Sequence, residues 1–346
     1  MGLLSAIKDS GDQRWADILL ECGKSAEGTV SEAAFGAMSS VRDARFIPLL
    51  IERLDKRDRR SVIREALIAL GDPALDALER ALQDQSLPFS VRIHNSSIDL
   101  LRFPTPRAVD CLLKILREEP SGAIRYKALR GLGRLQVDHR LRVDTKTVER
   151  RANMELREYL RLLALWFPIH EGLDERPAAT RASGKLLVLL LEDKQRQALE
   201  RAFRLLQLAH PRESIRSVSL ALRSRDRQMR AKALEYIDAL TLASSVPSNR
   251  ELIRIVGDDL SPRERLHLAE LHDIEPPEDY RATLLELIRE PSVSIAGLAA
   301  YHALELGEPG LREEVTIISE ERSLGGSLRS FIELMTARRK ESTGAA

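Results

Sequence analysis

Basic side chains are concentrated in one stretch of the sequence, and their type and spacing give the best support for binding chemistry. Residues 125–161 contain eleven Lys or Arg against five Asp or Glu, whereas residues 250–322 contain eight against seventeen. The whole chain has a formal net charge of only +1, so this total hides a charge dipole along the sequence. A basic stretch of this kind attracts acidic surfaces or phosphate groups.

We expect part of the basic stretch to dock an acidic surface on a partner protein. The predicted partner-binding residues are Lys127, Arg130, Arg134, Arg142, Arg150 and Arg151, with Arg140 and Lys146 in the same patch. Binding of nucleic acid or another anionic ligand through residues 125–161 is the alternative, and it ranks second because only Tyr126 and Tyr159 are close enough to stack on bases. The interpretation without a binding role is that residues 125–161 simply form the solvated face of arginine-rich helices.

Three arginines occupy the same position in a short sequence pattern that recurs along the chain and is described below. Two roles are possible for them. A row of arginines could bind successive phosphates, or it could form ion pairs that fix the register between neighbouring repeats. The second interpretation is favoured because aspartates in the preceding turns are suitably placed. The arginines are Arg92, Arg125 and Arg230, and the aspartates are Asp58, Asp84 and Asp226.

Metal, nucleotide and nucleophile chemistry find little support in the sequence. There is no Cys-x-x-Cys or His-Glu-x-x-His motif, and His267 and His272 are spaced for different faces of a helix. Gly131-x-Gly133 lacks the third glycine of a dinucleotide loop, and no P-loop is present. Cys111 lies in an apolar run and is expected in the core. We therefore expect no cofactor, no metal and no enzymatic activity, with a helical-repeat enzyme of unrecognised type as a further alternative.

The elements that must position the basic residues are expected to be paired helices. Residues 124–129 and 229–234 share a pattern: an apolar residue, a basic residue, two variable positions, a small residue and an aliphatic one. Weaker copies occur at 62–67, 91–96 and 295–300. A helix pair that is reused in this way cannot bury its apolar face alone, so neighbouring pairs must stack.

Local signals mark several helix boundaries. Gly71 predicts a left-handed stop, followed by Asp72 as a cap and Pro73 in the first turn of the next helix. Thr105 is a predicted cap, and Ser261 begins a predicted capping box.

The repeat pattern is lost in the middle of the chain, which predicts an interruption there. One longer helix is expected over residues 148–167, and the pattern then resumes with helices at 185–191 and 198–209. The predicted organisation is N-terminal capping helices at 1–42, a first stack at 43–135, an irregular insertion or hinge at 136–180, and a second stack with C-terminal capping helices at 181–346.

These repeats resemble HEAT repeats, a family of paired-helix solenoids. The resemblance implies an all-α, right-handed superhelix in which the second helices of the pairs line the concave face. The stretch 201–234 is similar to the HEAT segment that follows a nucleotide-transporter-like (major-facilitator) membrane domain in some bacterial proteins. That likeness implies a soluble relative or a cytoplasmic portion of such a system.

Composition agrees with a folded helical protein and sets its expected location. Apolar residues make up 43% and charged residues 31%, which argues against bulk disorder. The longest aliphatic run, Leu186–Leu191, is far shorter than the roughly 20 residues of a spanning helix. Two distant cysteines favour a reducing, cytoplasmic setting. The sequence therefore predicts a non-catalytic scaffold for protein–protein interaction, as a regulatory module of a larger system, with no insertion into membranes.

Overall fold

The chain is helical throughout the parts that its structure describes. The computed structural model describes residues 2–54, 58–84, 103–119, 122–222, 224, 226–242, 244–308 and 310–321, and every regular element within these ranges is a helix, which confirms the all-α class. The weaker repeat copy at 91–96, which includes Arg92, and residues 322–346 of the predicted C-terminal capping region lie outside the described residues. The chain divides into two compact units, Met1–Asp144 and Thr145–Ala346, and this boundary falls inside the predicted insertion.

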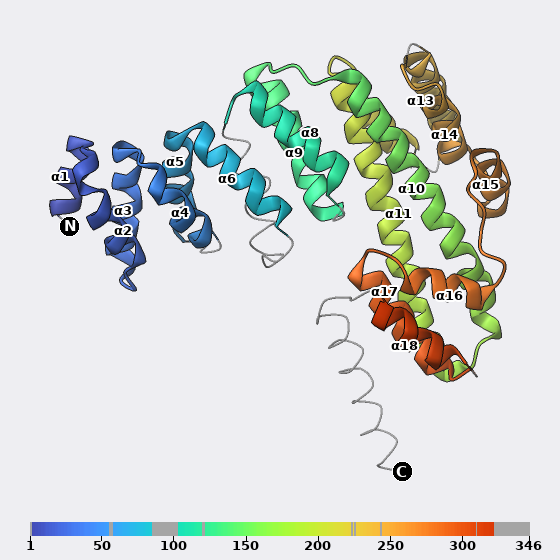
Figure 1. The fold of residues 1–346 in the computed structure, drawn as a ribbon. Helices are drawn as coiled ribbons and strands as arrows, with labels where there is room; N and C mark the ends of the chain where they lie inside the picture. Colours follow the sequence, from blue (N-terminus) through green and yellow to red (C-terminus); the bar gives the residue numbers. More distant parts are fainter. Residues whose placement is uncertain are drawn as a thin grey trace. The chain divides into compact units, whose positions relative to one another are not determined.

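The first unit contains short helices that pack on their next and next-but-one neighbours (Figure 1). Its helices are α1 (Gly2–Ser10), α2 (Ala16–Lys24), α3 (Gly28–Val41), α4 (Ile47–Arg53), α5 (Arg60–Leu70), α6 (Asp72–Gln83), α8 (Pro106–Glu118) and α9 (Gly122–His139), with 3-10 turns η1 (Gln13–Trp15) and η2 (Ala44–Phe46). Helix α3 packs on α1, α2 and α5, helix α4 packs on α2, α5 and α6, and α8 packs on α9. Phe35, Phe46 and Leu67 are fully buried in this unit.

The junctions between successive pairs repeat the same backbone feature. Gly11, Arg42 and Gly71 all have positive φ, at 63°, 53° and 66°, and an aspartate follows each of them. The first two aspartates, Asp12 and Asp43, each accept a 2.9 Å hydrogen bond from the backbone N–H two residues later. Gly71 ends α5 as predicted, but its ψ of −141° is not left-handed helical, whereas Arg42, with a ψ of 45°, is. The positive φ of Arg42 could not be predicted from the sequence, because an arginine rarely adopts it.

Two of the three predicted caps are confirmed. The Thr105 hydroxyl accepts a 3.2 Å hydrogen bond from the Ala108 N–H at the start of α8. Ser261 and Glu264 form the complete capping box of α15 (Pro262–Ala269). Asp72 is instead the first residue of α6 and its side chain makes no capping bond, so that prediction is wrong.

A recurring arginine links the two helices of a pair. Its guanidinium donates to the backbone carbonyl six residues earlier, just beyond the end of the preceding helix, where carbonyls lack intrahelical partners. The pairs are Arg60 with Leu54 at 2.9 Å, Arg125 with Glu119 at 2.9 Å, and Arg230 with Ser224 at 2.7 Å.

This contact corrects the predicted ion-pair ladder. Asp226 does not pair with Arg230 but caps α13 (Arg227–Thr241) by accepting from the Gln228 N–H at 2.8 Å. Arg230 pairs with Asp259 at 2.9 Å instead. The arginine position is therefore structural, as expected, but its shared acceptor is a backbone carbonyl.

The second unit is organised around two long antiparallel helices (Figure 1). They are α10 (Thr145–Gly172) and α11 (Arg181–Ala209), joined through η4 (Leu173–Glu175) and η5 (Ala178–Thr180). The prediction of a break between residues 191 and 198 is wrong, because the intervening residues are helix formers without Gly or Pro. Helix α10 also continues past Pro168, although a proline in this position leaves the Ala164 carbonyl without its helical donor.

Shorter helices surround this hairpin of α10 and α11. They are α12 (Ile215–Leu222), α13, α14 (Ser248–Gly257), α15, α16 (Tyr280–Ile288), α17 (Val293–Leu306) and α18 (Leu311–Glu321), with η6 (Glu270–His272) after α15. Helices α14, α15 and α16 pack on α10, helices α12 and α17 pack on α11, and α18 packs on α16 and α17. The second unit thus departs from the neighbour-by-neighbour packing of the first.

Candidate functional site

Three predicted partner-binding residues form a stripe on α9 in the first unit. Lys127, Arg130 and Arg134 are spaced by three and four residues, so they lie on one face of the helix. Arg130 and Arg134 are exposed and Lys127 is half-buried. The opposite face of α9 carries the buried residues Ile124 and Leu132. The stripe is therefore held in place by the packing of α9 on α8.

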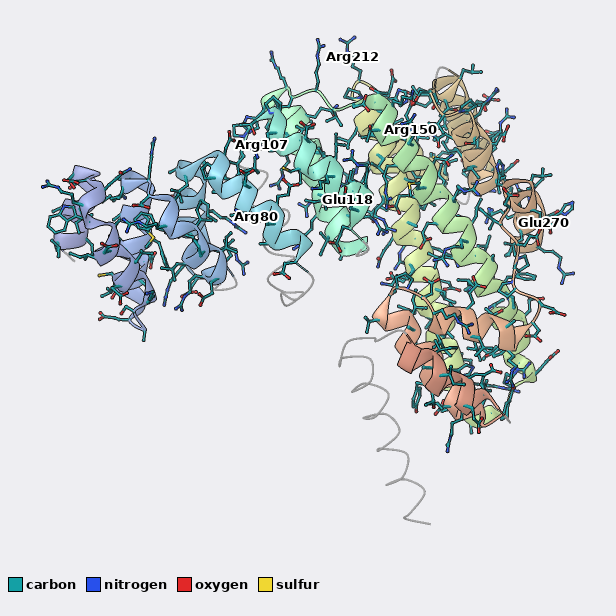
Figure 2. All side chains as sticks on the ribbon, in the orientation of Figure 1. Arg80, Arg107, Glu118, Arg150, Arg212 and Glu270 are labelled. Carbon is teal, nitrogen blue, oxygen red and sulfur yellow. The ribbon has the colours of Figure 1, made fainter. Side chains whose placement is uncertain are left out.

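The other three predicted residues do not belong to this stripe. Arg142 is exposed in the segment after α9, at the end of the first unit, and Arg150 is exposed on α10 in the second unit (Figure 2). Arg151 is only 9% exposed, and its guanidinium lies 3.0 Å from the Glu155 carboxylate. The prediction that Arg151 is a surface contact is therefore wrong.

Arg151 belongs to a buried charge cluster instead. Glu155 is 1% exposed and also accepts a 2.8 Å bond from Nε of Arg201 on α11. On the same part of α10, Glu149 accepts hydrogen bonds from the backbone and hydroxyl of Ser245. Buried charges require partners of this kind, so this basic residue serves the interior of the second unit.

The exposed arginines of α9 differ from most arginines that the structure describes. Arg45 bridges Asp43 and Asp17, each at 2.8 Å, and Arg161 lies between Glu158 and Glu290. Within the described ranges, no carboxylate pairs with Arg130 or Arg134. Their positive charge is therefore available to an approaching anionic surface.

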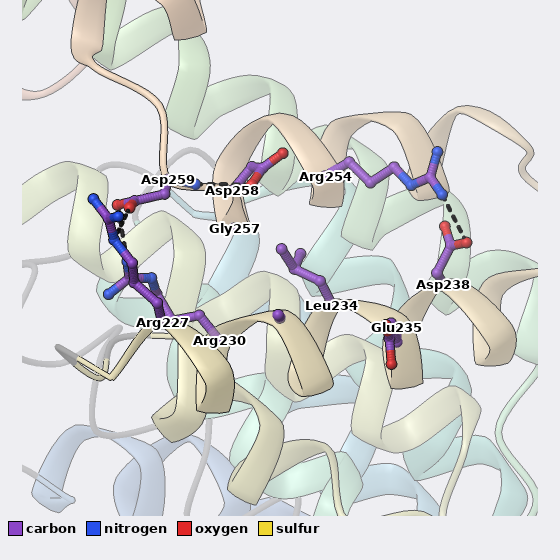
Figure 3. Close-up of a pocket in the computed structure, with 10 residues that line it drawn as sticks. Arg227, Arg230, Leu234, Glu235, Asp238, Arg254, Gly257, Asp258 and Asp259 are labelled. Atoms are coloured by element: carbon purple, nitrogen blue, oxygen red, sulfur yellow. Dashed lines mark hydrogen bonds and ion pairs between the residues drawn. The ribbon is translucent and has the colours of Figure 1, made fainter.

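A groove between α13 and α14 is a second candidate site (Figure 3). Its volume is about 540 Å³, and its walls carry Arg227, Arg230, Ala231, Leu234, Glu235, Asp238, Arg254, Gly257, Asp258 and Asp259. The floor is closely packed, since a Cβ on Gly257 would stand 2.6 Å from Cδ2 of Leu234. Sequence reasoning missed this groove, although its α13 wall lies next to the Met229–Leu234 repeat.

Ion pairs occupy both ends of the groove. Arg227 and Arg230 lie 3.1 and 2.9 Å from Asp259 at one end, and Arg254 lies 2.9 Å from Asp238 at the other. Hydrogen bonding to the Arg250 guanidinium, with a smaller contribution from Arg254, lowers the pKa of Asp238 to about 2. Because these cations already have carboxylate partners, the groove is less suited to an anion than the α9 stripe.

A serine and a histidine meet inside the second unit, which raises the possibility of nucleophilic chemistry. Ser183 Oγ on α11 lies 2.7 Å from Nδ1 of His302 on α17, a contact expected of a nucleophile and its base. Ser183 is 4% exposed and His302 is fully buried, so no substrate can reach the hydroxyl in this conformation. The contact could not be found in the sequence, because the two residues are 119 positions apart.

The described residues show neither a metal-binding cluster nor a membrane-spanning helix. No group of three or more His, Cys, Asp or Glu side chains within those ranges could hold a metal ion. Burial raises the pKa of the Cys111 thiol to about 12, which leaves this sulfur as an inert thiol at neutral pH. None of the helices in the described part of the chain is long and apolar enough to cross a membrane.

Comparison with known proteins adds no relative to these observations. No protein-family model matches the sequence, and no curated protein matches it. The HEAT-like character of the chain therefore stays a prediction that rests on its own repeats and packing.

Proposed function

We propose that this chain is a binding scaffold of the HEAT-like, paired-helix type and that it docks an acidic surface of a partner protein. Support for the architecture comes from the first unit, where α1, α3 and α5 pack in succession and α2, α4 and α6 do the same. The recurring positive φ at residues 11, 42 and 71 gives the same support at the level of the backbone. Stacked pairs present a continuous surface to a partner.

The observation that carries the proposed function is the contrast between two sets of arginines. The repeat-position arginines Arg125 and Arg230 are engaged with backbone carbonyls. Arg130 and Arg134, by contrast, are exposed and have no carboxylate partner in the described ranges. Exposed charges of one sign steer an oppositely charged partner and set the rate of association. The proposed contact residues are Lys127, Arg130 and Arg134 on α9, with Arg142 in the same unit.

The proposed partner is a protein rather than a nucleic acid. Stacking platforms for bases need aromatic side chains beside the cationic groove, and Tyr126 on α9 is half-buried among the basic residues. We place the scaffold in the cytoplasm as a regulatory module of a larger, transporter-linked system, in line with the sequence resemblance at 201–234. An enzymatic role has no accessible nucleophile–base pair to support it in the described residues.

The first test reverses the exposed charges of α9. The double variant Arg130→Glu/Arg134→Glu should lose most of the partners that the parent protein recovers in a pull-down at physiological salt. At this salt concentration, charges attract one another only within about 8 Å, so reversing the charges at the contact itself removes the attraction. Circular dichroism should be unchanged, since neither side chain is buried. The matched control Lys232→Glu/Arg289→Glu makes the same change in charge at exposed positions of the second unit.

The outcomes of this test separate the alternatives. Equal recovery of partners by the parent and by Arg130→Glu/Arg134→Glu would reject the α9 stripe as a docking site. A titration with duplex DNA gives the second arm. Binding that weakens steeply with salt and is lost in the double variant would assign the stripe to nucleic acid, because phosphate neutralisation releases counterions.

A further inference from the structure

A buried chain of polar side chains fastens α16 and α17 to the closed end of the α10–α11 hairpin. His302 on α17 lies between Ser183, in the first turn of α11, and Tyr280, the first residue of α16. The hairpin closes tightly around it. A Cβ on Gly184 would stand 3.0 Å from Cε1 of His302, and one on Gly172 would stand 2.8 Å from Cδ2 of Tyr280. Four helices thus meet at this point.

In this chain of side chains, each hydrogen bond is donated in the same direction, from Tyr280 towards Glu305. Ser183 gives its only hydroxyl proton to the Glu305 carboxylate, so Nδ1 of the neutral His302 carries the ring proton and Nε2 accepts from the Tyr280 hydroxyl at 2.6 Å. Nδ1–H then donates to Ser183 Oγ at 2.7 Å, and Ser183 donates onward to the Glu305 carboxylate. Tyr301 donates to the other oxygen of Glu305 at 2.9 Å. The Tyr280 hydroxyl proton has an acceptor in this chain only while His302 is neutral.

Protonation of His302 would disrupt this chain in two ways. The imidazolium has two N–H donors and no acceptor, so Tyr280 would lose the atom to which its hydroxyl donates. A positive charge would also be placed at a fully buried position. The only other acceptor shown for Ser183 is the Thr180 carbonyl at 3.0 Å, which offers nothing to Tyr280.

The charged groups around His302 come from every element that packs on α17. Glu305 on α17 favours the charged imidazole, and Arg176, whose guanidinium lies 4.4 Å from the centre of the Tyr280 ring, opposes it. The other charged groups on the elements packed against α17 have partners of their own. Arg281 on α16 pairs with Glu308 and with Glu314 on α18, Asp279 caps α16, and Arg181 on α11 donates to the Arg176 carbonyl.

We propose that the Tyr280–His302–Ser183–Glu305 chain is an acid-sensitive latch, which holds α16 and α17 on the α10–α11 hairpin when His302 is neutral and releases them when it is protonated. This latch does not depend on the proposed partner or on the α9 stripe, because all of its residues belong to the second unit.

The direction of the pH dependence follows from the burial of the imidazole. Burial lowers the pKa of His302 to about 4 from an ordinary value of 6.5. The open state therefore takes up a proton at a higher pH than the closed state does. The opening constant of the latch is lowest and independent of pH above about pH 6.5, and it rises by up to about tenfold per pH unit as the pH falls towards about 4.

Amide hydrogen exchange of the full chain tests the latch. After correction for the intrinsic chemical rate, amides of α16 and α17 should lose protection between pH 6.5 and pH 4, while amides of α12 and α13 in the same unit serve as the reference. His302→Gln should abolish this difference, since a glutamine can accept from Tyr280 and donate to Ser183 without titrating. His267→Gln, at an exposed histidine of α15, should keep it.

Three results would overturn the latch. They are equal loss of protection in α16–α17 and in α12–α13, the same acid response in His302→Gln as in the parent, and a His302 that titrates near 6.5 in the folded protein. The last measurement uses the NMR pH titration of the His302 ring in the unmodified chain, so it remains decisive even when the glutamine variant fails to fold. A ring that stays neutral down to about pH 4 supports the latch.

Discussion

The two units of the chain differ in what they bury, because the buried charged side chains within the described ranges all belong to the second unit. In the first unit, pairs such as Arg45–Asp43 lie at the surface, and the interior is apolar around residues such as Phe46 and Leu50. In the second unit, Arg201 and Glu155 are buried together between α10 and α11. Apolar packing tolerates repetition of a simple pattern, whereas a buried ion pair fits one partner in one register. The comparison indicates that stability in the first unit depends on stacking and in the second unit on specific polar contacts.

The largest expected effect comes from a charge placed in the apolar interior of the first unit. Leu129 on α9 is 2% exposed, so Leu129→Asp should lower the free energy of unfolding of this unit by about 5 kcal/mol, because it removes apolar contacts and buries an unpaired carboxylate. Each unit has its own tryptophan, Trp15 and Trp166. Denaturant unfolding followed by Trp15 fluorescence in a Trp166→Phe background measures the effect.

The control for Leu129→Asp lies on the same helix. Val137 is 75% exposed, so Val137→Asp should leave the transition of the first unit almost unchanged. Unfolding of the second unit, followed by Trp166 in a Trp15→Phe background, should be the same in both variants. If Leu129→Asp is as stable as the parent, the assignment of the apolar face of α9 is wrong.

A somewhat smaller loss is expected when a carboxylate is removed from the interior of the second unit. Glu155→Gln leaves Arg151 and Arg201 buried without a counter-charge, which should cost about 3 kcal/mol. The Trp166 transition should shift, and the Trp15 transition should stay in place. Glu200→Gln removes an exposed partner of Arg204 on α11 and should have little effect. Equal shifts in the two variants would contradict the contrast between the units.

The smallest effect concerns the backbone of the junctions in the first unit. Arg42 has a φ of 53°, a conformation that costs a residue with a Cβ more than it costs glycine. Arg42→Gly should therefore stabilise the first unit by about 1 kcal/mol, measured from the Trp15 transition. Gly71→Ala places a Cβ at another junction with positive φ and should destabilise the first unit. A loss of stability in Arg42→Gly would mean that the positive φ of Arg42 is not a cost to this unit.

Features that depend on neighbouring residues could be predicted from the sequence in both units. Gly71, Thr105 and Ser261 mark helix ends because the interactions that stop or start a helix lie within a few residues. The continuity of α11 through residues 192–197 was missed, because a polar interval in an aliphatic pattern resembles a turn. In the structure, Glu192 accepts a 3.2 Å hydrogen bond from the Trp166 indole on α10, which gives that interval a tertiary partner.

The candidate site was predictable only in part, for a related physical reason. Arg130 and Arg134 could be assigned to one exposed helix face from their spacing. Arg151 could not be distinguished from Arg150 by composition, because its burial depends on Glu155 and on Arg201 from another helix. The His302 chain joins α11, α16 and α17 over more than a hundred positions, and nothing in a local window indicates such a contact.

Pro168 gives the α10–α11 hairpin a mechanical property. At 1.5 Å per residue, the 28 residues of α10 span about 42 Å, and the proline lies in the last quarter of that length, one turn before Gly172, whose Cβ would meet Tyr280. A helix bends most easily where a hydrogen bond of this kind is missing. Because Glu149 lies about 28 Å along the helix from Pro168, a bend of about 5° at the proline would displace it by about 2.5 Å. A small bend at this end of α10 would therefore be enough to break the hydrogen bonds between Glu149 and Ser245 at the other end.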